Sequence, residues 1–353
     1  MEVALLTIWH EKNFGAELQT YATVKLIQDL GHNVKVIDIR LSDCSHLNLK
    51  GKIGNFICSL GPNDKKFKKF WKKYIPKTKR YRSIKQLEIN PPVADIYIVG
   101  SDQVWNPAIT KEFYTAFFLK FGSNNISKNS FASSFGSDKW NYPQYTDEIK
   151  TILSNFNIIS CRENSGINIL RDTFNVKCAK HVIDPTLLLS NYSELIGNNI
   201  HKKNTLVYYP LSEDPELEQY SNKLGKILNL DVININSCSY VFNGIIWDRT
   251  DITDWVRNIA EAKFILTRSF HGVAFAIIHQ CQFAAVKGYN NRNTRISDLL
   301  QNLGIEDRYY DSFQEITENK PWERQIDYNS VNIKLAELKQ ESIAVLHNII
   351  ENK

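Results

Sequence analysis

The chain has 353 residues, of which 43% are hydrophobic and 12% aromatic, enough apolar material for two domain cores of roughly 150 to 180 residues each. A formal charge of +5 is small for this length and gives no reason to expect a nucleic-acid partner. No apolar run approaches the ~18 residues of a membrane span, and the N-terminus, MEVALLTIWHEKNFG, lacks the features of a signal peptide, so a cytoplasmic protein is expected. Six cysteines without a CxxC pair indicate reduced thiols rather than a zinc ribbon or a disulfide framework.

The start of the chain predicts a strand, a helix and a second strand. The apolar runs at residues 3–8 and 34–39 are typical of parallel strands covered on both faces. Between them, residues 18–30 have apolar side chains at helical spacing, and Gly31 follows as a stop signal. This βαβ opening leads into polar and basic sequence over residues 43–90, which is predicted to be an insertion or lid.

Strand and helix patterns alternate again after this segment. DIYIVGSDQVW (95–105) is a strand that runs into a polar loop, and a second alternating series begins at residues 205–209. A last run with apolar residues at helical spacing covers 331–350. The sequence therefore predicts an α/β protein with two doubly wound, Rossmann-like domains at residues 1–178 and 179–330, and a C-terminal helix at 331–353.

Polar side chains gather where predicted strands end, which is where ligands bind in open α/β sheets. TRSFHGVAF (267–275) places Arg268, Ser269, His271 and Gly272 between an apolar strand and an apolar helix. An arginine can hold an anion, and a helix N-terminus lowers the pKa of a histidine beside it. The alternative is that Ser269 only caps the helix and that His271 bonds to a nearby carbonyl.

Other strand ends show the same feature. The residues concerned are Asn13 and Gln19 after the first strand, Ser101, Asp102 and Gln103 in VGSDQVW, and Arg162 with Glu163 in SCRENSG. Each has an ordinary explanation, as a helix cap or a surface ion pair. Their joint occurrence favours a ligand site.

Several familiar sites are missing from the sequence. No GxGxxG follows the first strand and GxxxxGK[ST] does not occur, so the dinucleotide-oxidoreductase and P-loop interpretations lose their main support. HExxH and GxSxG do not occur either. DCSH (43–46) lacks a second cluster of metal ligands. Neither a cofactor nor a metal is expected.

One basic segment stands out. KKFKKFWKKYIPKTKRYR begins at Lys65 and ends at Arg82, and it interleaves ten basic residues with five aromatic ones. It is either a solvated helix whose aromatic side chains pack on the first domain, or a surface that meets anionic lipid headgroups or a diphosphate-linked substrate.

Seven segments, in this order, resemble the polysaccharide pyruvyl transferase family: NFGAELQTYAT, DIYIVGSDQVWNP, SFASSFG, SCRENSG, VIDPTLLL, TRSFHGVAFAI and RISDLLQNLGIEDR. The resemblance implies a fold similar to two-domain GT-B glycosyltransferases, with the acceptor on the first domain and the donor on the second. It implies transfer of pyruvate from phosphoenolpyruvate to two hydroxyls of a sugar, forming a cyclic ketal on a cell-surface or capsular polysaccharide precursor. The acceptor would be a lipid-linked oligosaccharide, reached from the inner face of the membrane.

The resemblance also implies roles for individual residues. His271 matches the motif histidine, Arg162 the donor-binding arginine and Asp102 the acid of the Gly-Ser-Asp loop. Some members carry Arg-Leu-His where this chain has Ser269-Phe270-His271, and Arg268 is the candidate substitute.

We therefore expect His271 and Asp102 to be catalytic. The expected donor-binding residues are Arg162, Arg268, Ser269 and Gly272, and the expected acceptor-binding residues are Asn13, Gln19, Ser101 and Gln103. A GT-B glycosyltransferase that uses a nucleotide sugar, and a non-catalytic glycan-binding protein, remain alternatives.

Overall fold

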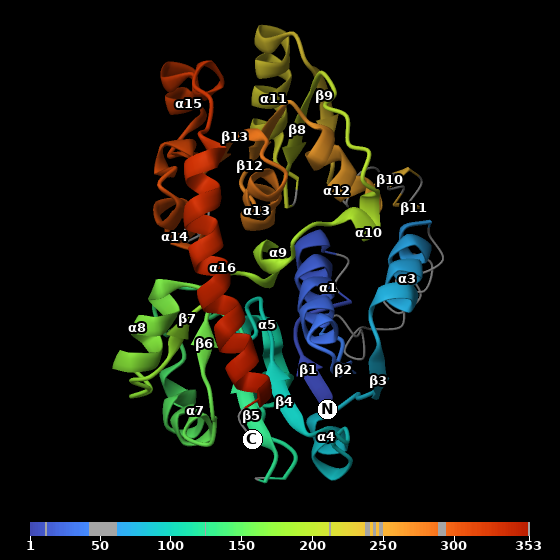
Figure 1. Cartoon of the computed structure of the whole chain (residues 1–353), viewed down its shortest axis with the longest axis vertical. Coiled ribbons are helices and arrows are strands. Elements are labelled where there is room, and N and C mark those ends of the chain that lie inside the picture. The colour runs from blue at the N-terminus through green and yellow to red at the C-terminus, as the bar shows by residue number, and fades with distance from the viewer. Residues whose placement is uncertain are drawn as a thin grey trace. The chain divides into compact units, whose positions relative to one another are not determined.

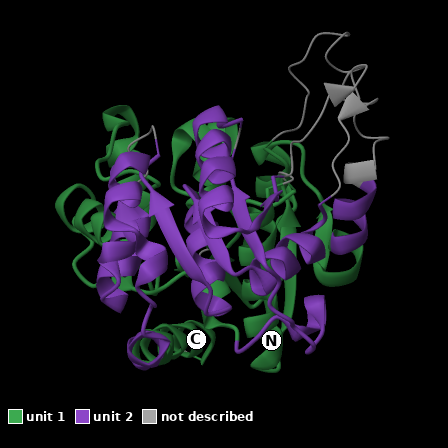
Figure 2. Ribbon diagram, turned by 90° about the horizontal axis from the view of Figure 1, so that it is seen from above, with its two compact units in different colours: residues 1–45, 71–189, 336–353 green, residues 46–70, 190–335 purple. Residues whose placement is uncertain are grey.

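The computed structural model describes residues 1–10, 13–41, 62–123, 125–211, 213–236, 241–242, 245–246, 250–288 and 294–351. The chain forms two compact units (Figure 2). Unit 1 comprises Met1–Ser45, Trp71–Leu189 and Ala336–Lys353, and unit 2 comprises His46–Phe70 and Ser190–Leu335. The division differs from the predicted one at residue 178, because the segment up to Leu189 and most of the C-terminal helix group with unit 1.

Unit 1 is built on a parallel sheet with the strand order β3-β2-β1-β4-β5 (Figure 1). Its strands are β1 (Glu2–Leu6), β2 (Asn33–Asp38), β3 (Lys77–Arg80), β4 (Ile96–Val99) and β5 (Ser127–Ser130). Leu5 and Ile98 are fully buried at the centre, as the continuous apolar runs predict for strands covered on both faces. The chain order reverses between β1 and β4, which makes their C-terminal ends the switch point where such sheets bind ligands.

A short parallel pair, β6 (Ser160–Cys161) and β7 (Lys180–His181), continues this arrangement. Single bridges between Asn129 and Ile158 and between Ser133 and Cys161 connect it to the strand β5 region. As a result, the loops that follow β4, β5, β6 and β7 all leave the same edge of unit 1.

The helices of unit 1 are α1 (Phe14–Asp29), α4 (Ile84–Ile89), α5 (Pro107–Thr110), α6 (Tyr114–Phe117), α7 (Thr146–Leu153), α8 (Asn164–Asp172) and α9 (Pro185–Leu188), with 3-10 turns at Lys111–Phe113 and Pro143–Tyr145. Helix α1 contacts α9 and is buried on nearly all sides. It begins at Asn13, whose side chain accepts a hydrogen bond from the Ala16 amide at 3.2 Å.

Unit 2 has its own parallel sheet, with the strand order β14-β13-β12-β8-β9. The strands are β8 (Thr205–Tyr209), β9 (Asp231–Asn234), β12 (Phe264–Thr267), β13 (Gln282–Val286) and β14 (Tyr309–Tyr310), and β10 (Val241–Phe242) with β11 (Ile245–Ile246) forms a separate antiparallel pair. The helices are α10 (Ser193–Ile196), α11 (Pro215–Leu228), α12 (Ile252–Glu261), α13 (Phe270–Ile278), α14 (Thr294–Leu303) and α15 (Phe313–Asn319), with 3-10 turns at Glu306–Arg308 and Pro321–Glu323. Here the switch point lies between β8 and β12.

The predicted C-terminal helix is α16 (Tyr328–Glu351). In unit 2 the Tyr328 hydroxyl donates to the Cys281 carbonyl at 2.5 Å. In unit 1 the Ser342 hydroxyl accepts a hydrogen bond from the Ile183 amide at 3.0 Å, and Lys339 Nζ donates to the Leu189 carbonyl at 3.3 Å. These hydrogen bonds anchor the first turn of α16 in unit 2 and its later turns in unit 1.

The predicted insertion at 43–90 is partly an element of the fold. Residues 42–61 lie outside the described part of the chain, but the remainder forms α3 (Pro62–Tyr74), the sheet strand β3 and helix α4. In α3 the aromatic side chains of Phe67, Phe70 and Trp71 are buried. For Trp71, whose Nε1 donates to Glu17 Oε2 at 2.6 Å, this agrees with packing on the first domain. No helix within the described ranges is long and apolar enough to cross a membrane.

Candidate functional site

In unit 1, the loop after β4 carries Ser101, Asp102 and Gln103 at the switch point. Asp102 has a positive φ of 74°, a conformation that is uncommon outside glycine. Its Oδ1 accepts a hydrogen bond from Arg162 Nη2 at 3.1 Å. The structure thus brings together Asp102 and Arg162, two residues that the sequence predicted for the site from different strand ends.

Arg162 follows β6 and is surrounded by acids. Its Nη1 donates to Asp184 Oδ2 at 2.6 Å and to Ser101 Oγ at 3.2 Å, and its Nε lies 3.8 Å from Glu163 Oε2. Burial alone lowers the pKa of Arg162, but Asp184, Asp102 and Glu163 outweigh burial, so the net shift of the pKa is upward. One permanently charged guanidinium is therefore held among three carboxylates.

Asp184 is a member of this cluster that the sequence did not identify. It precedes α9 and caps it, since its Oδ1 accepts hydrogen bonds from the Thr186 amide at 3.0 Å and the Thr186 hydroxyl at 2.7 Å. In the sequence, an aspartate directly before a proline at the first position of a helix is explained fully by helix capping. The sequence therefore gives no indication that the second carboxylate oxygen of Asp184 pairs with Arg162. The segment VIDPTLLL was the available signal.

Two of the four residues expected to bind the acceptor are enclosed by the protein. Gln19 and Ser101 are fully buried. Gln19 Nε2 donates to the carbonyls of Ile8 and Ala16, both at 3.0 Å. Because α1 is enclosed on nearly all sides, a residue in its second turn meets the chain's own backbone, which corrects the expectation that Gln19 faces an acceptor. Ser101 is likewise occupied by Arg162 and Asp184.

Gln103 and Asn13 lie at the same edge of the sheet. Gln103 is buried, and its Oε1 accepts a hydrogen bond from the Asn106 side chain at 3.3 Å. Gly136 leaves the room that Gln103 occupies, because a Cβ at Gly136 would lie 2.1 Å from Gln103 Oε1. Asn13 is partly exposed and acts as the cap of α1.

In unit 2, Arg268 follows β12 and is held by its neighbours. Its Nε lies 2.8 Å from Asp214 Oδ2, and its Nη2 donates to Glu216 Oε2 at 2.7 Å. Its Nη1 donates to the Lys287 carbonyl, and the guanidinium lies 4.8 Å from the centre of the Phe313 ring. A donor anion at Arg268 would therefore share the guanidinium with two carboxylates, which the sequence did not predict.

Ser269, His271 and Gly272 form the first turn of α13. Ser269 Oγ accepts a hydrogen bond from the Gly272 amide at 3.4 Å, so the capping interpretation of Ser269 is confirmed. Gly272 lets the helix approach β12, because a Cβ there would lie 2.5 Å from Thr267 Oγ1. His271 is buried, and its ring stands at 88° to the Phe270 ring.

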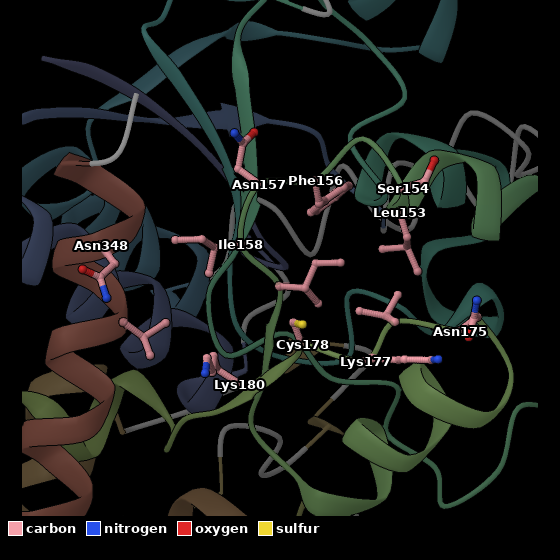
Figure 3. Close-up of a pocket in the computed structure, with 13 residues that line it drawn as sticks. Leu153, Ser154, Phe156, Asn157, Ile158, Asn175, Lys177, Cys178, Lys180 and Asn348 are labelled. Carbon is pink, nitrogen blue, oxygen red and sulfur yellow. The ribbon is translucent and has the colours of Figure 1, made fainter.

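A cavity with a mostly apolar wall lies elsewhere. It has a volume of about 460 Å³ and is formed within unit 1 (Figure 3). Its lining includes Ile158 and Ile159, which precede β6, as well as Cys178, which precedes β7, and Lys180, the first residue of β7. The cavity lies at the N-terminal ends of β6 and β7, whereas Arg162 and Asp184 follow the C-terminal ends of these strands. None of the predicted site residues lines this cavity.

Metal ligands are not clustered in the described ranges of the chain, where no group of three or more His, Cys, Asp and Glu side chains is placed to hold an ion. The sequence DCSH (43–46) lies outside those ranges. Cys161, Cys178 and Cys281 are free thiols, and Cys44, Cys58 and Cys238 are outside the described residues.

Two Rossmann-like units, each with polar groups at its switch point, define a protein of the GT-B-like α/β class, as the sequence predicted. The family model described as polysaccharide pyruvyl transferase matches residues 13–290. The chain therefore belongs to the polysaccharide pyruvyl transferase family and is a transferase of polysaccharide biosynthesis, which confirms the resemblance.

Solved structures with similar folds have little sequence identity with this chain. UGT89C1 of Arabidopsis thaliana complexed with UDP has a TM-score of 0.55 and 11% identity, and the match covers 99% of each chain. UDP-GlcNAc 2-epimerase of Methanocaldococcus jannaschii, in complex with UDP-GlcNAc and UDP, has a TM-score of 0.54 and 10% identity over 100% of each chain. UDP-N-acetylglucosamine 2-epimerase of Rickettsia bellii has a TM-score of 0.54 and 11% identity, covering 100% of this chain and 96% of that one. At these identities the likeness concerns the fold alone. A comparison with curated protein sequences gives no match.

Proposed function

We propose that the protein transfers pyruvate from phosphoenolpyruvate to two hydroxyls of a sugar and forms a cyclic ketal. The observation that carries this proposal is the family match over residues 13–290, which spans the switch-point loops of both units. Asp102 and Arg162 lie in one loop cluster and His271 in the other. The acceptor we propose is a lipid-linked oligosaccharide of a cell-surface polysaccharide, used in the cytoplasm at the inner face of the membrane.

The chemistry assigns tasks to these residues. A proton must reach the methylene carbon of phosphoenolpyruvate, which turns the neighbouring carbon into an electrophile that a sugar hydroxyl attacks. A second hydroxyl then displaces phosphate, and the ketal closes. His271 is the proposed acid, and Asp102 is the proposed acceptor of a hydroxyl proton. The first turn of α13 offers backbone amides to the donor's anionic groups.

The decisive experiment uses purified protein, phosphoenolpyruvate and a panel of lipid-linked and short soluble oligosaccharides. We expect phosphate release together with the mass gain of one pyruvyl group on the acceptor. The alternative is glycosyl transfer from a nucleotide sugar, which the GT-B-like fold partly favours. Sugar transfer from UDP-sugars without consumption of phosphoenolpyruvate would replace the proposal with that alternative.

Replacing His271 tests the proposed acid. For His271→Ala we expect turnover to fall about 100-fold, the usual scale for a lost general acid, because no proton is then delivered to the methylene carbon. The measurement is steady-state phosphate release, with thermal unfolding as the check that the variant folds. His201→Ala, at an exposed position of unit 2, is the matched control. Near-normal turnover by a folded His271→Ala protein would leave the histidine a structural residue.

A further inference from the structure

The buried cluster of unit 1 suggests a division of labour that differs from the one implied by the family resemblance. We propose that Asp102 is the residue that meets the substrate hydroxyl, and that Arg162 and Asp184 are positioning residues that hold Asp102 in place. On this view Arg162 does not bind the anionic donor. The inference rests on the proposed function, because it assigns roles within that reaction.

The contacts of Arg162 leave little of its guanidinium for a ligand. Both terminal nitrogens donate to side chains of unit 1, Nη1 to Asp184 at 2.6 Å and Nη2 to Asp102 at 3.1 Å. The Arg162 side chain is 1% exposed. A phosphate or carboxylate from solvent would have to displace existing charge-assisted hydrogen bonds to reach it.

The charge of the cluster also disfavours the donor. Three carboxylates surround one guanidinium, and phosphoenolpyruvate carries a phosphate and a carboxylate of its own. Like charges repel strongly where water is excluded, so an anion placed here would meet an excess of negative charge. A neutral sugar hydroxyl meets no such penalty, and a carboxylate oxygen is a good acceptor for its proton.

Accessibility singles out Asp102 within the cluster. Its side chain is 16% exposed, against 0% for Asp184 and 1% for Glu163. Its backbone is also held at a positive φ of 74°, a strain that a surrounding structure maintains most often at functional sites. Asp102 is thus the group of this cluster through which a ligand can be contacted.

Asp184 is suited to fix Arg162 because it is itself fixed. One of its oxygens is bound by the amide and hydroxyl of Thr186, and the other accepts from Arg162 and from Ser101. Asp184 therefore holds the guanidinium of Arg162 in place, and Arg162 in turn holds the carboxylate of Asp102. Glu163 is held separately, because its Oε1 accepts a hydrogen bond from the Phe135 amide at 3.0 Å.

The proton balance of the reaction fits this assignment. Each sugar hydroxyl that forms a C–O bond to the central carbon of the donor loses one proton. One of the two protons ends on the methylene carbon, which becomes a methyl group, and the other leaves with phosphate as the C–O bond to phosphate breaks. Asp102 takes the proton of an attacking hydroxyl and passes it to the departing phosphate, so its carboxylate is ionised again before the next turnover.

The test separates a positioning role from a donor-binding role. The variants are Asp102→Asn, Arg162→Lys and Asp184→Asn, and the measurements are kcat, the KM for phosphoenolpyruvate and the direct affinity for phosphoenolpyruvate by calorimetry. We expect kcat to fall about 100-fold for Asp102→Asn and at least about tenfold for the other two. We expect donor affinity to stay within about twofold of the wild type in all three, since none of these residues touches the donor.

A double variant supplies the sharpest criterion. If Arg162 acts through Asp102, adding Arg162→Lys to Asp102→Asn lowers kcat by less than about twofold more, because the two changes remove one interaction. The matched control is Arg171→Lys, which alters an exposed pair whose Nε lies 2.7 Å from Asp172 Oδ1 in the same unit. That control is expected to keep wild-type kinetics.

Opposite results overturn the inference. A loss of donor affinity of about tenfold or more in Arg162→Lys, with kcat unchanged, would make Arg162 a donor anchor. Should Arg162→Lys and Asp184→Asn not fold, as judged by thermal unfolding, Ser101→Ala perturbs the same pair more gently and must show the same fall in kcat at unchanged donor affinity. Wild-type protein that neither binds nor consumes phosphoenolpyruvate would refute the proposed function itself, which is a different result.

Discussion

Three residues that follow strands of unit 1 have strained backbone conformations. Asp102 and Ala132, which follow β4 and β5, both have positive φ values, of 74° and 56°. His10, which follows β1, has a φ of 65°. Such conformations cost roughly 1 to 3 kcal/mol each and persist where the surroundings enforce them. Their position at one edge of unit 1 agrees with a site built from the loops there.

Gly272 is the residue on which the fit of α13 against β12 depends. For Gly272→Ala we expect a destabilisation of about 1 to 3 kcal/mol, because the new methyl group would overlap Thr267 Oγ1 at 2.5 Å in a close-packed interior. The Thr267 side chain cannot easily turn away, since its hydroxyl donates to the Tyr209 carbonyl at 3.0 Å. Denaturant unfolding of the two proteins measures the difference, and an unchanged midpoint would show that the helix shifts freely.

His10 makes the stability of unit 1 depend on pH. Burial, followed by the charge of Arg40, lowers the pKa of His10 from 6.5 to about 3, against an opposing effect of Asp38. Between these two pH values the unfolded chain binds a proton at His10 that the folded chain does not, so stability falls as the pH falls from about 6.5 towards 3. The effect is absent above pH 6.5, where the histidine is neutral in both states.

The corresponding variant is His10→Asn, since asparagine tolerates a positive φ and does not titrate. We expect its stability to decline less than that of the wild type between pH 7 and pH 4, measured by urea unfolding at several pH values. The remaining decline includes His279 of unit 2, whose pKa is lowered to about 4 by burial and by Lys202. Parallel pH profiles for the two proteins would contradict this account.

At the scale of elements, α3 and α16 show which side chains a helix buries and which it leaves exposed. In α3 the aromatic residues face the protein, whereas Lys68, Lys69 and Lys72 are exposed. In α16 a polar residue, Ser342, is buried because it serves the backbone of the segment before α9. That segment carries Asp184, so α16 supports the loop cluster indirectly.

Removing the Ser342 hydroxyl tests this support. We expect Ser342→Ala to lower the free energy of unfolding by about 1 to 3 kcal/mol, because the buried Ile183 amide loses its acceptor. Gln340→Ala changes an exposed position of the same helix and is expected to have little effect. Circular dichroism during urea unfolding gives both values. Equal stabilities would mean that another group, or water, replaces the Ser342 oxygen.

At the scale of the whole molecule, each unit has its own hydrophobic core. One cluster includes Leu6, Val99 and Trp105 of unit 1, and the other includes Leu206, Leu266 and Ala284 of unit 2. Composition predicted two cores, and the alternating patterns predicted the α/β class of both. The assignment of the acceptor to the first and the donor to the second stays a prediction.

The basic face of α3 is the feature that bears on location. We propose that it gives salt-sensitive binding to anionic membranes. The contact is made by lysines alone, because Phe67, Phe70 and Trp71 are buried and unavailable to lipid. Each lysine near an anionic bilayer contributes on the order of 1 kcal/mol. The test is co-sedimentation with phosphatidylglycerol vesicles at low and high salt.

Two charge-matched variants complete that test. The first replaces Lys65, Lys66, Lys68, Lys69, Lys72 and Lys73 by glutamine, and the second replaces the scattered, exposed Lys85, Lys111, Lys139, Lys150, Lys177 and Lys180. We expect the first to lose vesicle binding while its activity on a short soluble acceptor is preserved, and the second to keep most of both. Equal binding by the two variants would reduce the effect to net charge, and no binding by the wild type would leave α3 a solvated helix.

Much of this fold and part of the site could be predicted from the sequence because the signals are local. Apolar runs predicted β1, β4 and β12, and the residues directly after them, such as Asp102 and Arg268, were predicted at strand ends. In a parallel sheet, chain order and strand direction alone bring such loops to one edge. The order of the seven motifs along the chain also indicated the family, because each motif is a short contiguous run of residues.

Tertiary structure decided what those residues do, because ion pairs depend on contacts between distant parts of the chain. Asp184 lies 22 positions from Arg162, and Ser101 lies 61 positions from it, yet both are within 3.2 Å of its guanidinium. Periodicity reports which face of an element is buried, but it carries no information on which acid meets which base across two strands. That pairing is set by register, loop path and rotamer to within a fraction of an ångström, and so Arg162 turned out to be enclosed by carboxylates of its own unit.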